Sequence, residues 1–492
     1  MRDVYLGVDL GTSSAKAVLL DGQGLVLAQA QSRYDVHRPA SDWAEQDPES
    51  WWRAVCGVIS DVLSRGPFRV LSVGLAGQMH GLVLVDDAGL PTRNAIIWSD
   101  SRSRAQERIW ADRVGNDTVT TTTGFPIATG FAGVSLSWVR DEEPEAYGRA
   151  STVLLPKDFI RYRLTGELST EPTDAGGSLL YDIRHHTPAT AIMSELELDP
   201  DLFPSVVPSL SVSGAVSSEA ARETGLAAGT PVAAGGSDQS MGTMVLGLED
   251  PSRVAIAISS GGTVFKRTAR PLDSRFGLHV MPHAVEGTWL AMGVVLSAGL
   301  GIDWLADRVF GEQRSPAALS ALMADADDVP AGSEGLMFSA ALAGTRTPRV
   351  DASRRGSLVG LGFEHGKAHI ARAMVEGVCV GLDASVRSMA QAGEPIREIV
   401  VSGGGARFPV WRQTLSDVTG LPVVVSSDLE HSAMGAASTG ALAVGRPLET
   451  DFGTHVGETI HPDPAAVAVY SELRSELASV ELALANRKEP QS

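Results

Sequence analysis

The segment GGSDQSMGT, residues 235–243, places one carboxylate among glycine, serine, threonine and glutamine. Asp238 has no basic residue closer in sequence than Arg222 and Arg253. Glycine together with aspartate is typical of a surface turn without chemistry, and that is one interpretation of the segment. The other is a general base, because a carboxylate without cationic neighbours keeps a pKa that allows it to accept a proton.

A second segment, DLGTSSAKAVLLD at residues 9–21, holds a tight turn of small residues. The backbone N–H groups of such a turn, with the hydroxyls of Thr12 and Ser13, form a concavity that suits a polyphosphate. Asp9 could hold a hydrated Mg²⁺ ion, which typically takes one or two carboxylates, and Lys16 could neutralise phosphate charge. The alternative is an ordinary β-hairpin without a ligand.

Two further glycine-rich turns follow expected strands, SSGGTV at residues 259–264 and SGGGA at residues 402–406. Glycine allows the backbone to approach a flat or anionic ligand closely. Three such turns, the first with an aspartate, indicate nucleotide binding. The P-loop pattern is absent, and no GxGxxG pattern follows a strand.

The elements that must position these turns can be read from hydrophobic periodicity. Two strand–turn–strand units about 250 residues apart, near residues 4–20 and 254–267, predict two similar α/β domains that face each other. Apolar residues on one face predict a helix from residue 48 to 63. The uncharged stretch 289–302 is expected to be a buried helix, and Lys157 with Asp158 a structural pair.

Composition excludes several classes of partner. The 492-residue chain carries 40 Lys and Arg against 59 Asp and Glu, a formal net charge of −19, which argues against nucleic acid and anionic membranes. Cys56 and Cys379 are expected to be buried free thiols. Asp3 and Asp9 interrupt the apolar core that a signal peptide needs, so a cytoplasmic location is expected.

The order of these motifs resembles the FGGY carbohydrate kinases, which have the actin-like (ribonuclease H-like) ATPase fold. DLGTSS, GGSD and SGGGA occur in that family's order, and residues 356–376 fit its second signature. The resemblance extends over residues 3–445. WAEQDPESWW, GLAGQMHG and AIIWSDSR are most similar to the branch of the family that phosphorylates D-xylulose.

The resemblance implies a role for each site residue. Asp238 would be the catalytic base and Asp9 would organise Mg²⁺. Four residues would line the sugar pocket: Gln78, Met79, His80 and Gln239. Eleven would bind ATP: Gly11, Thr12, Ser13, Lys16, Gly261, Gly262, Thr263, Gly403, Gly404, Gly405 and Gln413.

The resemblance also implies an organisation and a reaction. Residues 1–246 would form a sugar-binding domain, residues 247–445 a nucleotide-binding domain and residues 446–492 a helical extension, with a catalytic cleft between the domains. ATP and Mg²⁺ would serve to phosphorylate the C5 hydroxyl of D-xylulose, giving D-xylulose 5-phosphate and ADP. A homodimer is the assembly expected.

Two alternatives stay open. Gln239 stands where the family pattern has asparagine, and GTRTPR at residues 344–349 departs from its GERTPH. These differences favour another ketopentose or a pentitol as substrate. The second alternative is a non-catalytic sugar-binding regulatory protein on the same fold.

Overall fold

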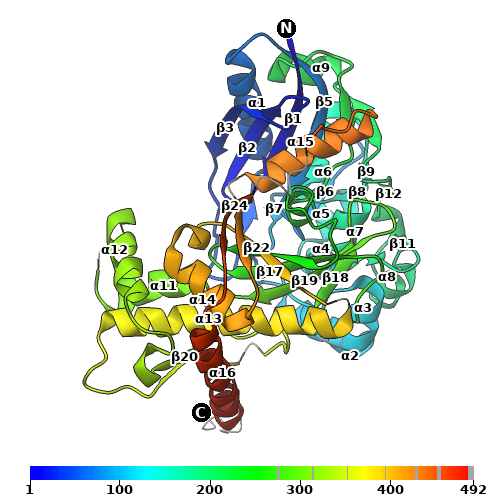
Figure 1. The fold of residues 1–492 in the computed structure, drawn as a ribbon. Helices are drawn as coiled ribbons and strands as arrows, with labels where there is room; N and C mark the ends of the chain where they lie inside the picture. The colour runs from blue at the N-terminus through cyan, green and yellow to red at the C-terminus, as the bar shows by residue number, and fades with distance from the viewer. Residues whose placement is uncertain are drawn as a thin grey trace.

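The computed structural model describes residues 1–273, 277–312, 315–351, 353–393, 395–426, 430–450 and 456–485. Within these residues the chain forms two seven-stranded mixed sheets, each flanked by helices (Figure 1). The first sheet runs in the order β13–β14–β5–β1–β2–β3, with β15 paired to β5, and the second in the order β18–β19–β17–β16–β22–β23–β24.

The first sheet begins with the predicted strand–turn–strand unit, to which β3 adds a third strand. β1 pairs antiparallel with β2, β2 pairs antiparallel with β3, and β5 lies parallel to β1 on its other side. The strands are β1 (Arg2–Leu10), β2 (Ser14–Leu20), β3 (Val26–Arg33), β5 (Phe68–Gly77), β13 (Val212–Ala215), β14 (Pro231–Ala233) and β15 (Gly236–Ser237).

Helices cover both faces of this sheet, so its central strands are mainly apolar. Helix α1 (Pro48–Ser64) begins where the side chain of Asp47 accepts a hydrogen bond from the N–H of Glu49, and its predicted apolar face is buried. Helix α15 (His431–Ala443) packs on the other face against β1 and β5 (Figure 1). A side chain at Gly7 or Gly74 would overlap the α15 backbone, so glycine allows this close approach.

The second sheet repeats the strand–turn–strand unit, since β16 and β17 pair antiparallel. Its strands are β16 (Arg253–Ile258), β17 (Gly262–Thr268), β18 (His279–Pro282), β19 (Trp289–Val295), β22 (Glu398–Ser402), β23 (Val423–Ser426) and β24 (Val456–Ile460). The helix predicted over residues 289–302 is wrong for the first half of that stretch, which is β19, while α11 (Gly299–Trp304) begins only near its end.

Helix α13 (Lys367–Ala392) covers one face of the second sheet and builds a core with Val254, Ile256 and Val264. The opposite face, through residues such as Phe265 and Leu290, shares a core with the helical region that follows β5. The two domains therefore meet through an apolar interface.

The helices of the intervening region and of the second domain are α2 (Arg104–Arg113), α3 (Asn116–Thr123), α4 (Ala132–Glu142), α5 (Pro144–Arg149), α6 (Pro156–Thr165), α7 (Pro172–Gly176), α8 (Thr190–Glu195), α9 (Ser218–Thr224), α10 (Asp238–Thr243), α12 (Pro316–Asp327), α14 (Pro409–Thr419) and α16 (Pro464–Ala485). Short paired strands are β4 (Glu45–Gln46), β6 (Val83–Val85), β7 (Ala95–Ile96), β8 (Thr152–Leu154), β9 (Ser169–Thr170), β10 (Tyr181–Asp182), β11 (Thr187–Pro188), β12 (Ser205–Val206), β20 (Met337–Ser339) and β21 (Ser357–Val359).

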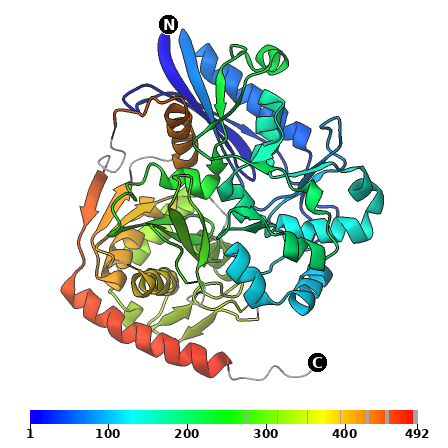
Figure 2. The same cartoon turned by 90° about the vertical axis from the view of Figure 1, so that its right-hand side faces the viewer.

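The segment after residue 445 is not only helical, which corrects the expected extension. It supplies β24 to the second sheet before α16, which runs along the outer edge of the second domain (Figure 2). Both cysteines are free: Cys379 is buried and Cys56 is half-buried.

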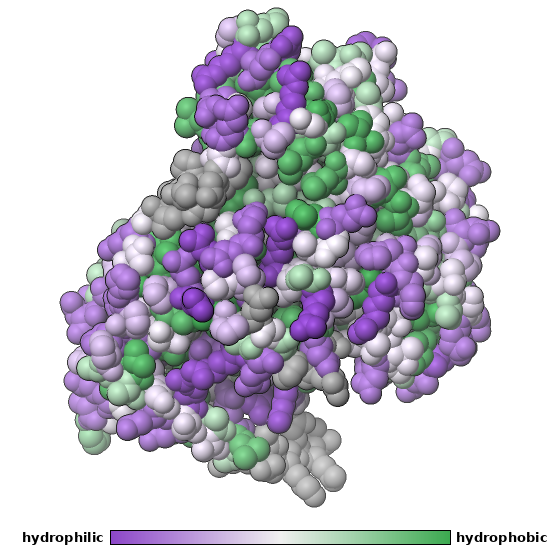
Figure 3. Space-filling view, turned by 45° about the vertical axis from the view of Figure 1, so that its right-hand side comes forward, coloured by the Kyte–Doolittle hydropathy of each residue, from purple (hydrophilic) through white to green (hydrophobic). Residues whose placement is uncertain are grey.

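One face of the molecule is mostly polar. Hydrophilic residues predominate on the face drawn in Figure 3, and apolar residues occur there in small groups. Among the described helices, none combines the length and the apolar character that crossing a bilayer requires.

Candidate active site

Asp238 lies where the first sheet ends. β15 pairs parallel with β5, and Asp238 is the residue directly after β15 and the first of α10. Gly235 precedes this strand with a φ of 76°, in the left-handed region that favours glycine. The segment is therefore a strand entering a helix, and Asp238 is half-buried rather than exposed at a surface turn.

The surroundings of Asp238 favour its protonated form. Burial, followed by the negative charge of Asp9, raises the pKa of Asp238 to about 7. Hydrogen bonds from Gln239 oppose this shift, and its backbone N–H lies 2.7 Å from Oδ1 of Asp238. A carboxylate with a pKa close to neutral pH is suited to general-base catalysis.

Strand register places Asp9 at the same end of the first sheet as Asp238. Asp9 on β1 and Gly236 on β15 are both aligned with Ala76 of the intervening strand β5. Burial raises the pKa of Asp9 to about 6, with Lys16 opposing and Glu430 adding to the shift. Oδ1 of Asp9 is buried and has no hydrogen-bond partner among the residues that the structure describes.

This orphaned oxygen fits a divalent cation. Mg²⁺ takes oxygen ligands and is usually held by one or two carboxylates, with water and phosphate oxygens completing the shell. In the described part of the chain, no group of three or more His, Cys, Asp or Glu side chains forms a metal cluster. Asp9 alone therefore matches a hydrated ion shared with phosphate rather than a closed protein site.

Lys16 has an ion-pair partner that the sequence did not indicate. Its Nζ lies 2.7 Å from Oε2 of Glu430, just before α15. Because these residues are more than 400 positions apart, no local pattern relates them. Lys16 is therefore a paired cation at the edge of the predicted phosphate site.

His80 has a left-handed backbone conformation and a ring nitrogen that is fixed by a hydrogen bond. Its φ is 71°, in the left-handed region that non-glycine residues rarely adopt. Burial lowers its pKa to about 4, so the ring is neutral near pH 7. Nδ1 lies 2.6 Å from the carbonyl oxygen of Gly177, which can only accept, so Nδ1 carries the proton and Nε2 is left as an acceptor.

The other predicted sugar-pocket residues lie nearby. The Met79 side chain is buried next to the same glycine, Gly177. Nε2 of Gln78 donates to Oε1 of Gln46 at 3.0 Å, and the Oε1 of Gln78 is buried without a hydrogen-bond partner in the described part of the chain. That free acceptor is available to a hydroxyl group.

The first predicted phosphate turn is tied to this pocket through Gln46. Its amide nitrogen donates to the carbonyl oxygen of Thr12 at 2.8 Å, while the backbone N–H of Gly11 donates to Ser14. Ser13 is exposed at the tip of the turn. The half-exposed indole of Trp98 donates to Oγ1 of Thr12 at 2.8 Å. Gln46 and Trp98 were not among the predicted residues, although both stand in the quoted segments WAEQDPESWW and AIIWSDSR.

The two glycine turns of the second domain lie against each other. Gly403 has a φ of 88°, and a Cβ there would come within 2.5 Å of the Ile258 carbonyl oxygen at the start of the other turn. A Cβ at Gly261 or Gly262 would meet its neighbours at 2.9 Å, whereas Gly404 faces open space. Thr263, which pairs with Ala257, is half-buried. The structure thus brings these two predicted phosphate- and adenosine-binding turns together, including Gly405, which packs on Ile258.

Gln413 has hydrogen-bond partners that the sequence did not indicate. Its side-chain amide donates to Oδ1 of Asp417 at 2.9 Å and to the carbonyl oxygen of His461 at 3.1 Å. The amide is therefore directed toward the segment between β24 and α16, where it joins α14 to the end of the chain. This hydrogen bonding gives Gln413 a structural role that the sequence did not reveal.

The two-domain fold and the family comparison together define the class of the protein as a sugar kinase. Residues 4–245 match the N-terminal domain, and residues 256–444 the C-terminal domain, of the FGGY family of carbohydrate kinases. The chain belongs to this family, so it is a phosphotransferase with the actin-like α/β fold, as the sequence resemblance implied.

The chain is also similar to individual sugar kinases of known name. The chain is 32% identical over 444 residues to xylulose kinase of Bacillus subtilis strain 168, covering 89% of this chain and 88% of that protein. It is 27% identical to gluconokinase of the same strain over 454 residues, covering 91% and 88%. The crystal structure of xylulose kinase from Rhodospirillum rubrum superposes with a TM-score of 0.91 at 28% identity, covering 98% of this chain and 99% of that one.

Proposed function

We propose that the chain transfers the γ-phosphoryl group of ATP to the C5 hydroxyl of D-xylulose, giving D-xylulose 5-phosphate and ADP. The observation that carries the proposal is Asp238, a half-buried carboxylate whose pKa is raised to about 7 beside Asp9. The xylulose kinases among the relatives support this sugar over others.

In the proposed reaction, Asp238 takes the proton of the C5 hydroxyl as its oxygen attacks the γ-phosphorus. The bond from the γ-phosphorus to the oxygen that bridges to the β-phosphate breaks, and ADP leaves. Such transfers depend mainly on positioning and charge neutralisation. Neutral His80 would accept a hydrogen bond from a sugar hydroxyl through Nε2, and Gln78 through its free Oε1.

Magnesium fits the same scheme. Asp9, through its unpartnered Oδ1, would hold the hydrated ion. When bound, Mg²⁺ neutralises phosphate charge and orients the γ-phosphoryl group. Its charge would also offset the repulsion that Asp9 exerts on Asp238, and so favour the ionised base.

The test of catalysis is Asp238→Asn, with Asp87→Asn at an exposed position as the matched control. We expect kcat to fall by about 10²- to 10⁴-fold in the first variant, the usual contribution of a general base. Calorimetric titration with D-xylulose would show that the variant still folds and binds. Unchanged kcat in Asp238→Asn would refute the base role, while absence of phosphoryl transfer in the parent would favour the regulatory alternative.

A different sugar is the second candidate, favoured by Gln239 and by the gluconokinase relative. Gln239 is one methylene longer than the asparagine of the family pattern and lies next to the base. The kcat/KM values for D-xylulose, D-ribulose, xylitol and gluconate, measured for the parent and for Gln239→Asn, decide between them. The D-xylulose proposal requires that this sugar rank first for the parent; another sugar in first place would replace it.

A further inference from the structure

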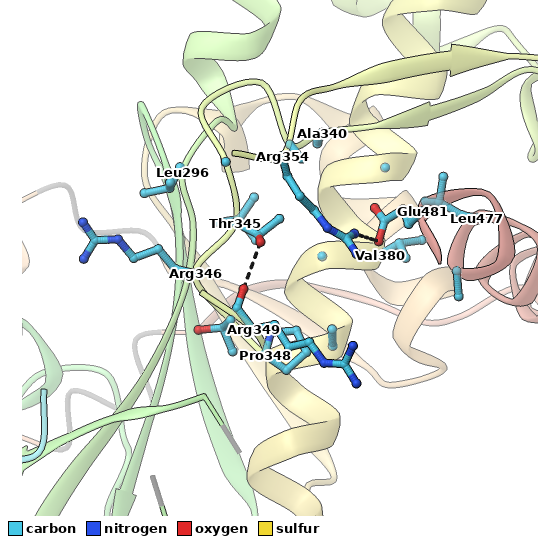
Figure 4. A pocket seen from close by; sticks show the side chains of 18 of the residues that line it. Leu296, Ala340, Thr345, Arg346, Pro348, Arg349, Arg354, Val380, Leu477 and Glu481 are labelled. Atoms are coloured by element: carbon cyan, nitrogen blue, oxygen red, sulfur yellow. Dashed lines mark hydrogen bonds and ion pairs between the residues drawn. The ribbon is translucent and has the colours of Figure 1, made fainter. Parts of the chain in front are cut away.

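A separate cavity of about 430 Å³ lies in the second domain, between α13, α16 and the segment 340–349 (Figure 4). Its walls are largely aliphatic, with Val295 and Leu296 from the end of β19, Val380 from α13 and Leu477 from α16. None of the residues predicted to bind the sugar, the metal ion or the nucleotide lines it. The predicted roles thus leave this cavity unexplained.

The polar part of the lining is strongly cationic. Five arginines line the cavity, and Glu481 is the single acidic residue among its lining residues in the described chain. The arginines are Arg346, Arg349, Arg354, Arg387 and Arg474. Such a concentration is unusual in a chain with a net charge of −19.

Ion pairs compensate only part of this charge. Arg354 lies 3.0 Å from Glu481, drawn as a dashed line in Figure 4, and 3.6 Å from Asp351. Arg387 and Arg474 share one carboxylate, Asp383, at 2.6 and 2.9 Å. Arg346 interacts electrostatically with Glu107, which lies outside the lining. Among the described residues, Arg349 has no ion pair, so a small excess of positive charge remains at this mainly aliphatic cavity.

We propose that this cavity binds a small organic anion, one that carries a phosphate or carboxylate group on an apolar body. The arginines supply donors that match such a group, and the aliphatic walls accept the apolar part. Ligand pockets are commonly mainly apolar with a few polar groups that fix orientation, and their volumes begin near 300 Å³.

The position of the cavity connects it to the nucleotide turn. Val294 and Val295 line the cavity, and their backbones pair with Thr263 and Gly262 of β17. Oγ1 of Thr347, also in the lining, accepts from the N–H of Val294 at 3.1 Å. A ligand in the cavity would therefore contact the end of β19, which pairs with β17 beside the predicted phosphate turn at residues 259–264.

The segment 344–349, which lines the cavity, also lies toward the predicted sugar pocket. Arg346 points away from the Arg354–Glu481 pair (Figure 4). Its positive charge acts on His80 and His279, where it lowers both pKa values in addition to burial. A shift of the segment 344–349 would therefore alter the field at the sugar pocket, and we infer that the bound anion changes the KM for ATP or for sugar. This second part rests on the proposed function; binding itself does not.

The experiment is calorimetric titration of the full-length protein with phenyl phosphate and with phenylacetate. Benzyl alcohol and inorganic phosphate serve as apolar-only and charge-only controls. Saturating D-xylulose and a non-hydrolysable ATP analogue occupy the active site. Ala478→Trp, at the cavity wall on α16, blocks the cavity, and Arg349→Glu reverses one charge; Ser475→Trp, an exposed position of α16 outside the lining, is the matched control.

We expect one of the two aromatic anions to bind at least about tenfold more tightly than either control compound. Ala478→Trp and Arg349→Glu should each weaken binding by about tenfold, and Ser475→Trp should leave it unchanged. Equal binding of benzyl alcohol, or binding unaffected by Ala478→Trp, overturns the site. The bound anion should shift the KM for ATP or sugar by about fivefold or more; binding without such a shift would refute the regulatory part alone. If the chain failed to phosphorylate sugars, the cavity variants would still decide the binding proposal.

Discussion

The raised pKa of Asp238 predicts a pH dependence that an ordinary aspartate would not give. A base works only when it is deprotonated, so activity falls as the pH drops through its pKa. With a pKa of about 7, about half of Asp238 is ionised at pH 7 and about a tenth at pH 6. An unperturbed aspartate, with a pKa near 4, would be ionised fully at both.

The magnitude follows from these fractions. Between pH 8 and pH 6 the kcat/KM for ATP should fall about tenfold, with about half of the maximum at pH 7. Asp9, whose pKa is raised to about 6, adds a second protonation that makes the fall steeper below pH 6. The kcat/KM for ATP should therefore fall only toward acidic pH in the range near neutrality.

A coupled assay of ADP release measures this profile at saturating D-xylulose. The concentration of the Mg²⁺–ATP complex is kept constant at each pH, because ATP itself binds protons in this range. The kcat/KM for ATP reports the enzyme before the nucleotide binds, which is the state in which Asp9 acts on Asp238.

Gln239→Leu supplies an internal comparison. The side chain of Gln239 hydrogen-bonds Asp238 and lowers its pKa, so removing it should move the midpoint to higher pH. A profile that is flat from pH 6 to pH 8, or a midpoint that moves downward in Gln239→Leu, would refute the reasoning.

Three further predictions concern the surroundings of the site. Lys157→Met should lower the free energy of unfolding by about 3–5 kcal/mol, because the buried carboxylates of Asp158, Glu171 and Asp174 lose their shared cation. Urea denaturation measures this loss, and a value below about 1 kcal/mol would show that these carboxylates tolerate an apolar neighbour. Gly74→Ala should cost about 1–3 kcal/mol through overlap with Ala436, and an unchanged urea midpoint would contradict the close packing of α15. Asp9→Asn should raise the Mg²⁺ concentration for half-maximal rate by about 10-fold or more, whereas an unchanged requirement would place the ion elsewhere.

The turns and the strands that carry them could be predicted because their signals are local. Small residues after a strand, the apolar face of α1 and each copy of the strand–turn–strand unit are contained within about twenty residues. The register that aligns Asp9 and Gly236 with Ala76 then follows from the fold. A sequence that specifies these elements also brings the two carboxylates together.

The errors arose where tertiary contacts decide the structure. Residues 289–302 carry no charge and are interpreted from the sequence as a buried helix, yet pairing with β17 and β18 on both sides makes the first half of the stretch a strand. A fully buried strand and a buried helix have the same apolar pattern, so periodicity cannot separate them. The ion pair between Lys16 and Glu430 could not be predicted for a related reason. Glu430 reaches Lys16 because α15 packs against the first sheet, although it lies more than 400 residues later in the chain.

Helix α15 has a consequence for how the chain is made. During synthesis, β1 and β5 emerge early, but the helix that covers their face is encoded some 350 residues later. Until the ribosome has passed residue 443, the surface at Gly7 and Gly74 has no cover. The first domain therefore completes its folding only after most of the second domain exists. A gene fragment that ends between the domains would encode an unfinished sheet rather than an independent sugar-binding module.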